Sequence, residues 1–321
     1  MFQTFADSAS PTQGPPRLAA LRAAMAAQGV QGFLVPRADA HQGEYVAPGD
    51  ARLAWLTGFT GSAGFACVLP DVAGVFVDGR YRVQVRDQVA DVFTPVHWPE
   101  VNLADWLNDH LGDGGKVGFD PWLHTTREIE GLRKDLAAKG IQIVATTNLV
   151  DEIWDDRPAP PGAAFTAYPD DLAGKSHTAK RVEIAEALTK AGATSAVLTL
   201  PDSIAWLLNI RGTDVERNPV PQAFAVVHAS GQVDLFARAG KADGIAQHLG
   251  PDVNVQDEAA FLGALAALQG AVQIDPKSAP QIVADALEQA GIKVIHGDDP
   301  CLLPKAIKTV AEIAGARAAH L

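Results

Sequence analysis

Cysteine is scarce in this sequence: its 321 residues include only two, Cys67 and Cys301. Neither belongs to a C-x-x-C pair, which excludes a zinc knuckle and a thioredoxin-type redox motif. Two isolated cysteines fit a reducing compartment. The N-terminal stretch, MFQTFADSASPTQGPP, lacks the basic start and apolar core of a signal peptide. The longest apolar run, AAFLGALAALQGAV, is too short to span a bilayer. We therefore expect a cytoplasmic protein.

Positive charge is also in short supply. The chain has 26 Lys and Arg against 38 Asp and Glu, which gives a formal net charge of −12. No basic run interrupts this acidity. A surface of this sign repels phosphate backbones and anionic lipids, so we expect no nucleic-acid partner and no membrane partner.

What remains is the composition of an ordinary globular protein, with 47% hydrophobic and 20% charged residues. The length suits two domains with two cores. Helical patterns and short apolar strands alternate along the chain, which predicts an α/β fold with a mixed or parallel sheet in each domain. Prolines cluster between Asp155 and Gly174, where no helix or strand can continue. This stretch is the best domain boundary.

The second half of the chain repeats the first. Each half contains a helix, a strand, a Trp-containing block and two further strands in the same order. The Trp-containing blocks are Leu53-Ala54-Trp55-Leu56 and Ile204-Ala205-Trp206-Leu207. The spacing of about 150 residues is that of a domain, not of a solenoid repeat. We infer a tandem duplication of one α/β domain, with Trp55 and Trp206 as core anchors.

Familiar catalytic motifs are missing. The Gly174-Lys175-Ser176 triplet has Pro169 where a P-loop needs glycine. The GDGGKVG segment at 112–118 precedes a strand, which favours a loop over a phosphate site. GSAG at 61–64 lacks the spacing of a nucleophile elbow, and its glycines are expected to allow close backbone packing.

Histidines and paired acids give no better candidate for a site. None of the nine histidines forms an H-E-x-x-H pattern, and we expect surface or hydrogen-bonded core roles for His41, His97, His110 and His124. Three acid pairs are expected to be solvated caps: Asp155-Asp156, Asp170-Asp171 and Asp298-Asp299.

One stretch combines a buried strand with a turn and an arginine: Val77-Asp78-Gly79-Arg80-Tyr81. Arginine at a strand end can offer a two-pronged fork to a carboxylate or a peptide carbonyl. The alternative is a structural role, with Arg80 paired to Asp78 or capping a helix that starts near Tyr81. From the residues alone, the structural role is favoured.

The chain finishes on KTVAEIAGARAAHL, in which Ile307, Val310, Ala314 and Leu321 recur at helical spacing. No Gly, Asn or Pro closes this helix. An unfinished amphipathic helix indicates that these two domains serve a further part. The alternative is a stand-alone binding or scaffolding protein.

Five segments together resemble the N-terminal half of cytosolic-type Xaa-Pro aminopeptidases (aminopeptidase P) of the creatinase/prolidase superfamily, peptidase family M24. They are PRADAHQGEYVAPGDARLAWLTGFTGSAG, VDGRYRVQV, NLVDEIWDDRP, DSIAWLLNIRGTDVERNPV and KAIKTVAEIAGARAAHL. Prolidase and creatinase are similar too, but they normally carry one such domain, and two copies favour the longer aminopeptidase.

The resemblance implies two tandem ribonuclease-H-like domains, residues 1–155 and 156–304, each a mixed sheet flanked by helices. Residues 305–321 are then the first helix of an absent catalytic domain, which would be the partner of this chain. In the family that domain holds two divalent metal ions, usually manganese, on two Asp, one His and two Glu. None of these motifs matches residues 1–321, so no catalytic or metal residue is expected here.

The implied reaction of the parent protein removes the N-terminal residue from peptides with proline second, and the N-terminal half would gate substrate and assist assembly. Alone, this chain is expected to be inactive. The resemblance implies that Arg80 contacts the peptide and that Asp78 and Tyr81 support the loop. A homodimer is possible in the family, and a non-catalytic creatinase-like binding module is the alternative. The segment Asp39-Ala40-His41 is typical of the family but has no assigned role.

Overall fold

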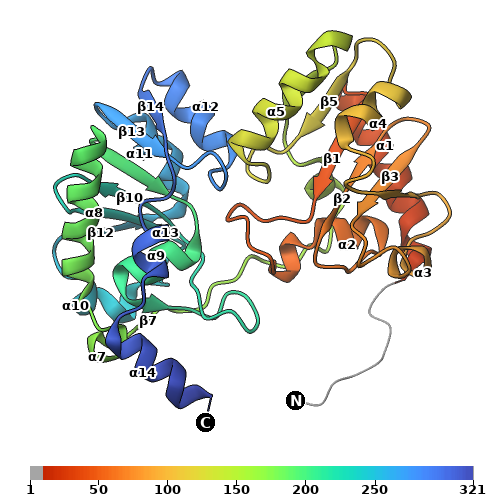
Figure 1. Cartoon of the computed structure of the whole chain (residues 1–321). Helices are drawn as coiled ribbons and strands as arrows, with labels where there is room; N and C mark the ends of the chain where they lie inside the picture. The colour runs from red at the N-terminus through yellow and green to blue at the C-terminus, as the bar shows by residue number, and fades with distance from the viewer. Residues whose placement is uncertain (1–9, 321) are drawn as a thin grey trace. The chain divides into compact units, whose positions relative to one another are not determined.

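The structure, a computed structural model, describes residues 10–320 and divides into two units (Figure 1). The first unit runs to Asp39 and resumes over Glu44–Pro160. The second comprises Ala40–Gly43 and the chain from Pro161 onward. Residues 40–43 therefore follow a strand of the first unit in sequence but pack within the second.

The first unit is built on a six-stranded sheet in the order β4-β3-β2-β1-β5-β6. β2 pairs antiparallel with β1 and β3, while the β1–β5, β5–β6 and β3–β4 pairs are parallel. The predicted mixed sheet is thus confirmed, with five strands pointing one way and β2 the other. The strands are β1 (Gly32–Pro36), β2 (Gly64–Val68), β3 (Ala73–Val77), β4 (Thr94–His97), β5 (Lys116–Phe119) and β6 (Gln142–Ala145).

Helices cover both faces of this sheet, and alternate residues of each strand supply two separate cores. Phe33 and Val35 of β1 join one apolar cluster, whereas Leu34 between them joins the other. The helices are α1 (Gly14–Gln28), α2 (Arg52–Thr57), α3 (Gln84–Gln88), α4 (Leu103–His110), α5 (Thr126–Leu136) and α6 (Leu149–Ile153), with 3-10 turns at Pro11–Gln13, Pro48–Asp50 and Ala137–Lys139.

The second unit has a sheet of the same design, in the order β12-β11-β10-β8-β13-β14. Here β10 is the strand that runs against its neighbours β8 and β11. A separate two-stranded sheet pairs β7 (Thr166–Ala167) with β9 (Ile210–Arg211). The strands of the main sheet are β8 (Ser195–Leu198), β10 (Phe224–His228), β11 (Val233–Ala237), β12 (Val253–Asp257), β13 (Ala271–Ile274) and β14 (Lys293–His296).

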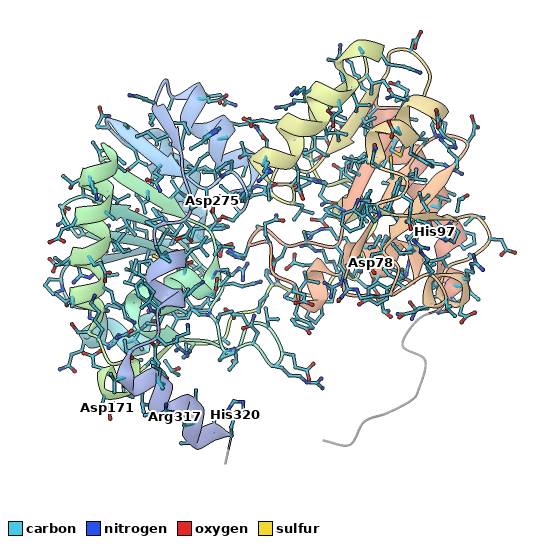
Figure 2. The ribbon with its side chains drawn as sticks, in the orientation of Figure 1. Asp78, His97, Asp171, Asp275, Arg317 and His320 are labelled. Carbon is cyan, nitrogen blue, oxygen red and sulfur yellow. The ribbon has the colours of Figure 1, made fainter. Side chains whose placement is uncertain are left out.

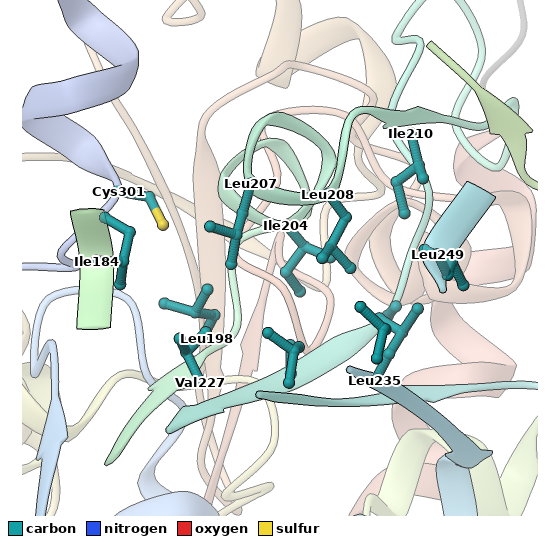
Figure 3. Close-up of a cluster of buried hydrophobic side chains, with 14 of the residues drawn as sticks. Ile184, Leu198, Ile204, Leu207, Leu208, Ile210, Val227, Leu235, Leu249 and Cys301 are labelled. Atoms are coloured by element: carbon teal, nitrogen blue, oxygen red, sulfur yellow. The ribbon is translucent and has the colours of Figure 1, made fainter. Parts of the chain in front are cut away.

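Figure 3 shows the apolar cluster that joins this sheet to its helices, with Leu198 and Leu235 on strands and Ile184, Leu207 and Cys301 above them. All five side chains are at most 1% exposed. The helices are α7 (Asp170–Ala173), α8 (His177–Ala191), α9 (Pro201–Leu208), α10 (Ala246–Leu249), α11 (Phe261–Ala266), α12 (Gln281–Gln289), α13 (Leu302–Ala306) and α14 (Val310–Ala319), with 3-10 turns at Asp243–Ile245 and Glu258–Ala260.

The identical strand order and directions confirm that one α/β fold occurs twice. The helices α1 and α8 each have 15 residues and each end at a glycine with positive φ, Gly29 and Gly192. A left-handed residue closes a helix most easily when it lacks a Cβ atom. The two Trp-containing blocks are equivalent helical segments, in α2 and α9.

Several expectations about single elements were wrong or incomplete. The helix expected near Tyr81 begins at Gln84, because residues 81–83 form a turn. The strand β12 and the small β7–β9 sheet were not predicted.

The C-terminal helix expected from about Lys305 is broken. α13 ends at Ala306, and α14 starts anew after Thr309, whose side chain caps it by accepting from the Glu312 backbone N–H. Of the predicted stripe, Ile307 is 67% and Val310 is 86% exposed, so that face is not buried. Leu321 lies outside the described residues.

Candidate functional site

Five of the six strands in the first unit end at one edge of the sheet, where polar side chains gather. The carboxyl ends of parallel strands are the usual position of ligand sites in α/β sheets. Asp78 follows β3 directly, and Asp120 follows β5. His97 at the end of β4 is the register partner of Val77, and Figure 2 labels it near Asp78. This edge is the candidate functional site, and we call it the first strand-end edge.

Arg80 is held at this edge by Asp78. Its Nε donates to both carboxylate oxygens of Asp78, at 3.2 and 3.1 Å, and its Nη2 donates to Oδ2 at 2.7 Å. The backbone N–H of Arg80 also donates to Asp78 Oδ1, at 2.9 Å. The side-chain hydrogen bonds from Arg80 lower the pKa of the Asp78 carboxyl. The structural role predicted for Arg80, an ion pair with Asp78, is therefore confirmed.

Tyr81 follows Arg80 in the same turn and is held by contacts with Ser62 and Phe59. Its hydroxyl lies 2.8 Å from Ser62 Oγ, and its ring meets Phe59 edge-on, with centroids 5.6 Å apart. Gly61 makes this packing possible, because a Cβ there would lie 2.2 Å from Phe59 Cζ and 2.9 Å from Tyr81 Cδ1. The close backbone approach expected of the GSAG glycines is found at Gly64, where a Cβ would lie 2.8 Å from the carbonyl oxygen of Phe76, whereas the neighbours of Gly61 are side chains. The hydrogen bond with Ser62 lowers the pKa of Tyr81.

The Asp78 ion pair leaves part of the Arg80 guanidinium open. Nη1 has no hydrogen-bond acceptor in the part of the chain that the structure describes, and the side chain is 63% exposed. The guanidinium carbon lies 5.1 Å from the centre of the Tyr81 ring. Arg80 is therefore oriented by Asp78 and Tyr81 while two N–H groups still face outward. A preoriented fork of this kind can bind a carboxylate or a carbonyl oxygen.

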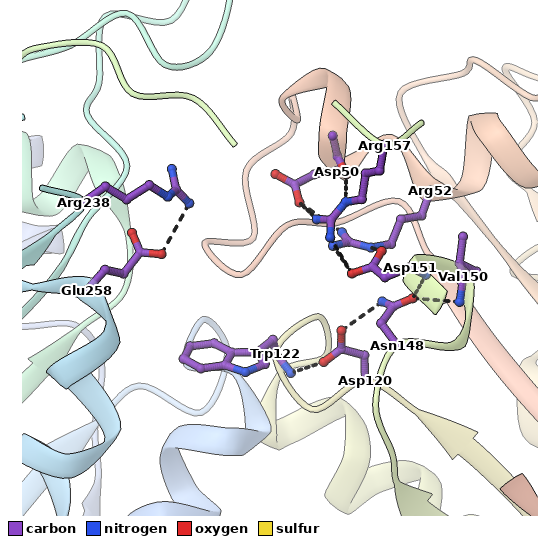
Figure 4. A network of polar contacts seen from close by, with 11 residues as sticks. Asp50, Arg52, Asp120, Trp122, Asn148, Val150, Asp151, Arg157, Arg238 and Glu258 are labelled. Carbon is purple, nitrogen blue, oxygen red and sulfur yellow. Dashed lines mark hydrogen bonds and ion pairs between the residues drawn. The ribbon is translucent and has the colours of Figure 1, made fainter. Parts of the chain in front are cut away.

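A second polar cluster lies deeper in the first unit (Figure 4). Arg52, only 4% exposed, donates to Asp151 through Nε at 2.6 Å and Nη2 at 3.0 Å, and to Asp50 at 3.0 Å. Asn148 donates to Asp120 Oδ2 at 2.9 Å. Burial raises the pKa of Asp120. These groups satisfy one another, as buried polar groups must.

Comparing equivalent positions of the two copies distinguishes residues that serve the fold from candidates for function. Arg17 and Lys180 are each the fourth residue of α1 and α8, and each bonds the carbonyl oxygen of the equivalent tryptophan, at 2.5 Å for Trp55 and 2.9 Å for Trp206. Each cation also lies over that tryptophan ring, at 4.3 and 4.6 Å. A pair kept in both copies serves the fold. The tryptophans are half-buried, so the expected core anchors are partly confirmed.

Asp120 and Asp275 form a second repeated position, each the first residue after its strand. Both accept the backbone N–H two residues on, from Trp122 and Lys277, at 2.9 Å in each copy. This carboxylate therefore closes the same turn in both units, which is again a structural role.

Arg80 has no such counterpart. The first, third and fourth residues after β3 are Asp78, Arg80 and Tyr81, and those after β11 are Arg238, Gly240 and Lys241. The ion pair and the open fork thus belong to the first copy alone.

The remaining candidates have mixed outcomes. His124 is buried, and its Nε2 has no hydrogen-bond partner within residues 10–320, so a satisfied core role is wrong for it. Burial lowers the pKa of His124 to about 4. Asp299, expected to be solvated, is only 6% exposed, and burial raises its pKa. The glycines of the GDGG segment lie in a loop before β5, as predicted.

Sequence reasoning missed the buried polar pairs. Lys241 and Asp214 form an ion pair at 2.6 Å with both side chains 0% exposed. For Asp120 and Asp275 the sequence does hold a clue, because each is followed by proline and this Asp-Pro dipeptide recurs in the two halves. No comparable signal marks Lys241, since its partner lies in a loop with no repeat.

Within residues 10–320, no three His, Cys, Asp or Glu side chains are arranged to hold a metal ion. The described residues therefore do not fit a dinuclear metal centre, and no chemical step is assigned to them. No helix in the same range has the length and apolar character needed to cross a membrane.

Comparison with known proteins shows which family models and relatives the chain matches. Residues 17–153 match the creatinase/prolidase N-terminal domain model, and residues 156–312 match a second model with the same description. A probable Xaa-Pro aminopeptidase P of Laccaria bicolor is 35% identical over 95% of this chain and 49% of its own length. Aminopeptidase P2 of Arabidopsis thaliana is 37% identical over 66% of this chain and 31% of its own length.

A solved structure agrees with these sequence matches. It is the X-prolyl aminopeptidase of Caenorhabditis elegans, described as a cytosolic enzyme with a di-nuclear active site. It superposes with a TM-score of 0.88 at 27% identity and covers 96% of this chain and 53% of the worm chain. The chain thus spans about half the length of the curated relatives it matches. Through its two consecutive N-terminal domains, the chain belongs to the creatinase/prolidase family.

Proposed function

We propose that this chain is the substrate-gating and assembly half of a dimetal Xaa-Pro aminopeptidase, which removes the N-terminal residue from peptides with proline in second position. The relatives at 33–37% identity bear that activity in their names, and they match along most of this chain. Proline fixes the backbone and removes an N–H, so this bond needs a cleft of its own shape. The N-terminal half would help to form that cleft.

The observation that carries the proposal is the position of Arg80 at the first strand-end edge. The residue is oriented by Asp78, is largely exposed, and has no counterpart in the second copy. A carbonyl or carboxylate of the peptide would accept from the open Nη1 group. Asp78 and Tyr81 would act as supports, holding the arginine rather than touching the peptide.

The catalytic part of the parent protein would pack against α13 and α14. This end of the second unit carries apolar side chains that are exposed to water. Leu303 is 70%, Ile307 67%, Val310 86% and Ile313 42% exposed. A groove of about 550 Å³ is lined by Ile313, Ala316 and Arg317 of α14, among others. Exposed apolar residues gathered on one helix pair are typical of a contact surface.

The two divalent metal ions, expected to be manganese, would lie in that other part, because the described residues do not fit them. Their chemistry in such centres is to supply an activated water and to polarise the scissile carbonyl. We further propose a cytosolic location, by analogy with the worm enzyme, and a homodimer of the parent protein.

The proposal is tested by assaying the 321-residue chain alone and the longer parent protein on an Xaa-Pro peptide, with manganese. We expect hydrolysis by the parent and none by the chain alone. Metal-dependent hydrolysis by the chain alone would contradict a separate catalytic half. A parent protein without activity on any Xaa-Pro peptide would favour a non-catalytic binding module.

A further inference from the structure

The segment Ala40–Gly43 has a definite place in the second unit, although the sequence suggested no role for it. His41 is its anchor and is only 3% exposed. Its Nδ1 lies 3.1 Å from the carbonyl oxygen of Thr199. A carbonyl oxygen can only accept, so Nδ1 carries the hydrogen in this contact.

The imidazole ring of His41 is also stacked. It lies on the ring of Phe224, with centroids 4.5 Å apart and planes 28° apart. Phe224 in turn stacks on Phe261 at 4.5 Å and 9°. His41 therefore completes a three-ring stack and takes part in a directed hydrogen bond, which is a specific mode of binding and not a loose surface contact.

This place is the counterpart of the first strand-end edge. Thr199 is the first residue after β8, and Phe224 opens β10. The register of the two sheets aligns Thr199 and Phe224 with Pro36 and Phe65, which are paired in the first unit. His41 thus occupies, in the second unit, the edge at which α/β sheets take ligands.

The neighbouring part of the same edge is occupied by buried side chains of the second unit itself. Lys241, the counterpart of Tyr81, has its side chain fully buried and donates to Asp214 Oδ2 at 2.6 Å and to the Gln222 carbonyl at 3.0 Å. The backbone N–H of Gln222 donates to the same Asp214 oxygen at 2.7 Å. Gly240 stands where the first unit has Arg80. No exposed fork is left at this position.

We infer that the strand-end edge of the second unit is an internal docking site whose ligand is the segment Ala40–Gly43, with His41 as the anchor. One copy of the duplicated fold keeps an open edge with Arg80, and the other has turned the equivalent edge into a binding site for its own chain. This inference stands independently of the proposed enzymatic role.

The test is amide hydrogen exchange on the whole chain, followed by mass spectrometry. In His41→Ala, we expect exchange at residues 199–203 and 224–228 to accelerate about tenfold or more, since the stack and the hydrogen bond are both lost. His41→Phe keeps a ring, and His41→Asn keeps a donor, so each should show a smaller acceleration. His296→Ala, an exposed histidine of the same unit, is the control and should change neither segment.

Local acceleration in that order, with the strands of the first unit unaffected, supports the docking site. Unchanged exchange at both segments in His41→Ala would overturn it. If His41→Ala does not fold, the Phe and Asn variants decide: exchange equal to that of the unaltered chain in both would also overturn the inference.

Discussion

At the scale of single residues, exposure and repetition together identify what each arginine does. Arg52 is buried and fully paired, and Arg17 has a counterpart in Lys180, so both stabilise the fold. Arg80 is paired on one side and open on the other, with no counterpart. The sequence pointed to Arg80 through its strand-turn-arginine pattern, and it also predicted the ion pair with Asp78. The sequence could not show that this ion pair leaves Nη1 of Arg80 without an acceptor among the described residues.

Other residues could not be predicted because their surroundings come from distant segments. Burial of His124, Asp299 and Lys241 depends on side chains far away in the sequence, which local spacing does not reveal. Histidine spacing gave no hint that the ring of His41 stacks on Phe224.

His124 gives a prediction about pH. Because its pKa is about 4 in the folded state and about 6.5 when exposed, the unfolded chain binds more protons between these values. Stability therefore falls as the pH drops from 6.5 towards 4, by up to about 3 kcal/mol at 1.36 kcal/mol per pKa unit. NMR titration of the ring should give a midpoint near 4. In urea titrations, His124→Gln should lose this part of the acid sensitivity. A ring that titrates near its ordinary value would contradict the argument.

At the scale of elements, glycine residues close α1, the turn after α5 and α8. Apolar spacing near the C-terminus predicts one continuous helix, but the capping box of Thr309 and Glu312 starts α14 separately from α13. A capping box fixes a start through two reciprocal hydrogen bonds, even inside an apolar periodic stretch.

The turns that precede α6 and α13 allow a residue of one copy to be exchanged for its counterpart in the other. Asn148 and Asp299 are each the third residue after a strand, and each accepts a backbone N–H of the following turn. Asn148 can also donate to Asp120, at 2.9 Å, whereas a carboxylate at 299 cannot donate to Asp275. Burial raises the pKa of Asp299, so its ionisation costs stability as the pH rises above the ordinary range of an aspartate.

We therefore predict that Asp299→Asn stabilises the second unit near neutral pH by about 1 kcal/mol, the net value of one hydrogen bond. The gain should shrink as the pH falls, because the aspartate of the unaltered chain then becomes protonated. Thermal melts at pH 7 and pH 4 measure this difference. Asp298→Asn is the comparison: it removes an exposed ion pair with Lys277, which lowers the pKa of Asp298, and it should bring no gain in stability. A loss of stability in Asp299→Asn at pH 7 would show that the charge itself is needed in this turn.

At the scale of the whole molecule, the sequence was sufficient for the fold class and the repeat. Alternating apolar strands and helices and the Trp-containing blocks occur in the structure in their predicted order, whereas β7 and α7 lie inside the proline-rich stretch, where no element was expected. The short paired strands β7 and β9 and the exposed strand β12 were missed, because two-residue strands and half-polar strands carry little periodic signal.

The duplication explains why the two units share a framework and differ at one edge. The Arg17 and Lys180 contacts with tryptophan persist in both copies. The strand-end edge is open with Arg80 in the first unit and is filled by His41, Lys241 and Asp214 in the second. Under the proposed function, Arg80 of the first unit would contact the substrate.

The most direct measurement is the steady-state kinetics of Arg80→Ala in the parent protein on an Xaa-Pro peptide. Loss of a charge-assisted contact to bound peptide should raise KM about tenfold and leave kcat nearly unchanged. Arg86→Ala, an exposed arginine of α3, is the matched control and should behave like the unaltered protein. If Arg80→Ala has the same KM and the same kcat/KM as the unaltered protein, Arg80 does not contact substrate and the account of the first strand-end edge is wrong.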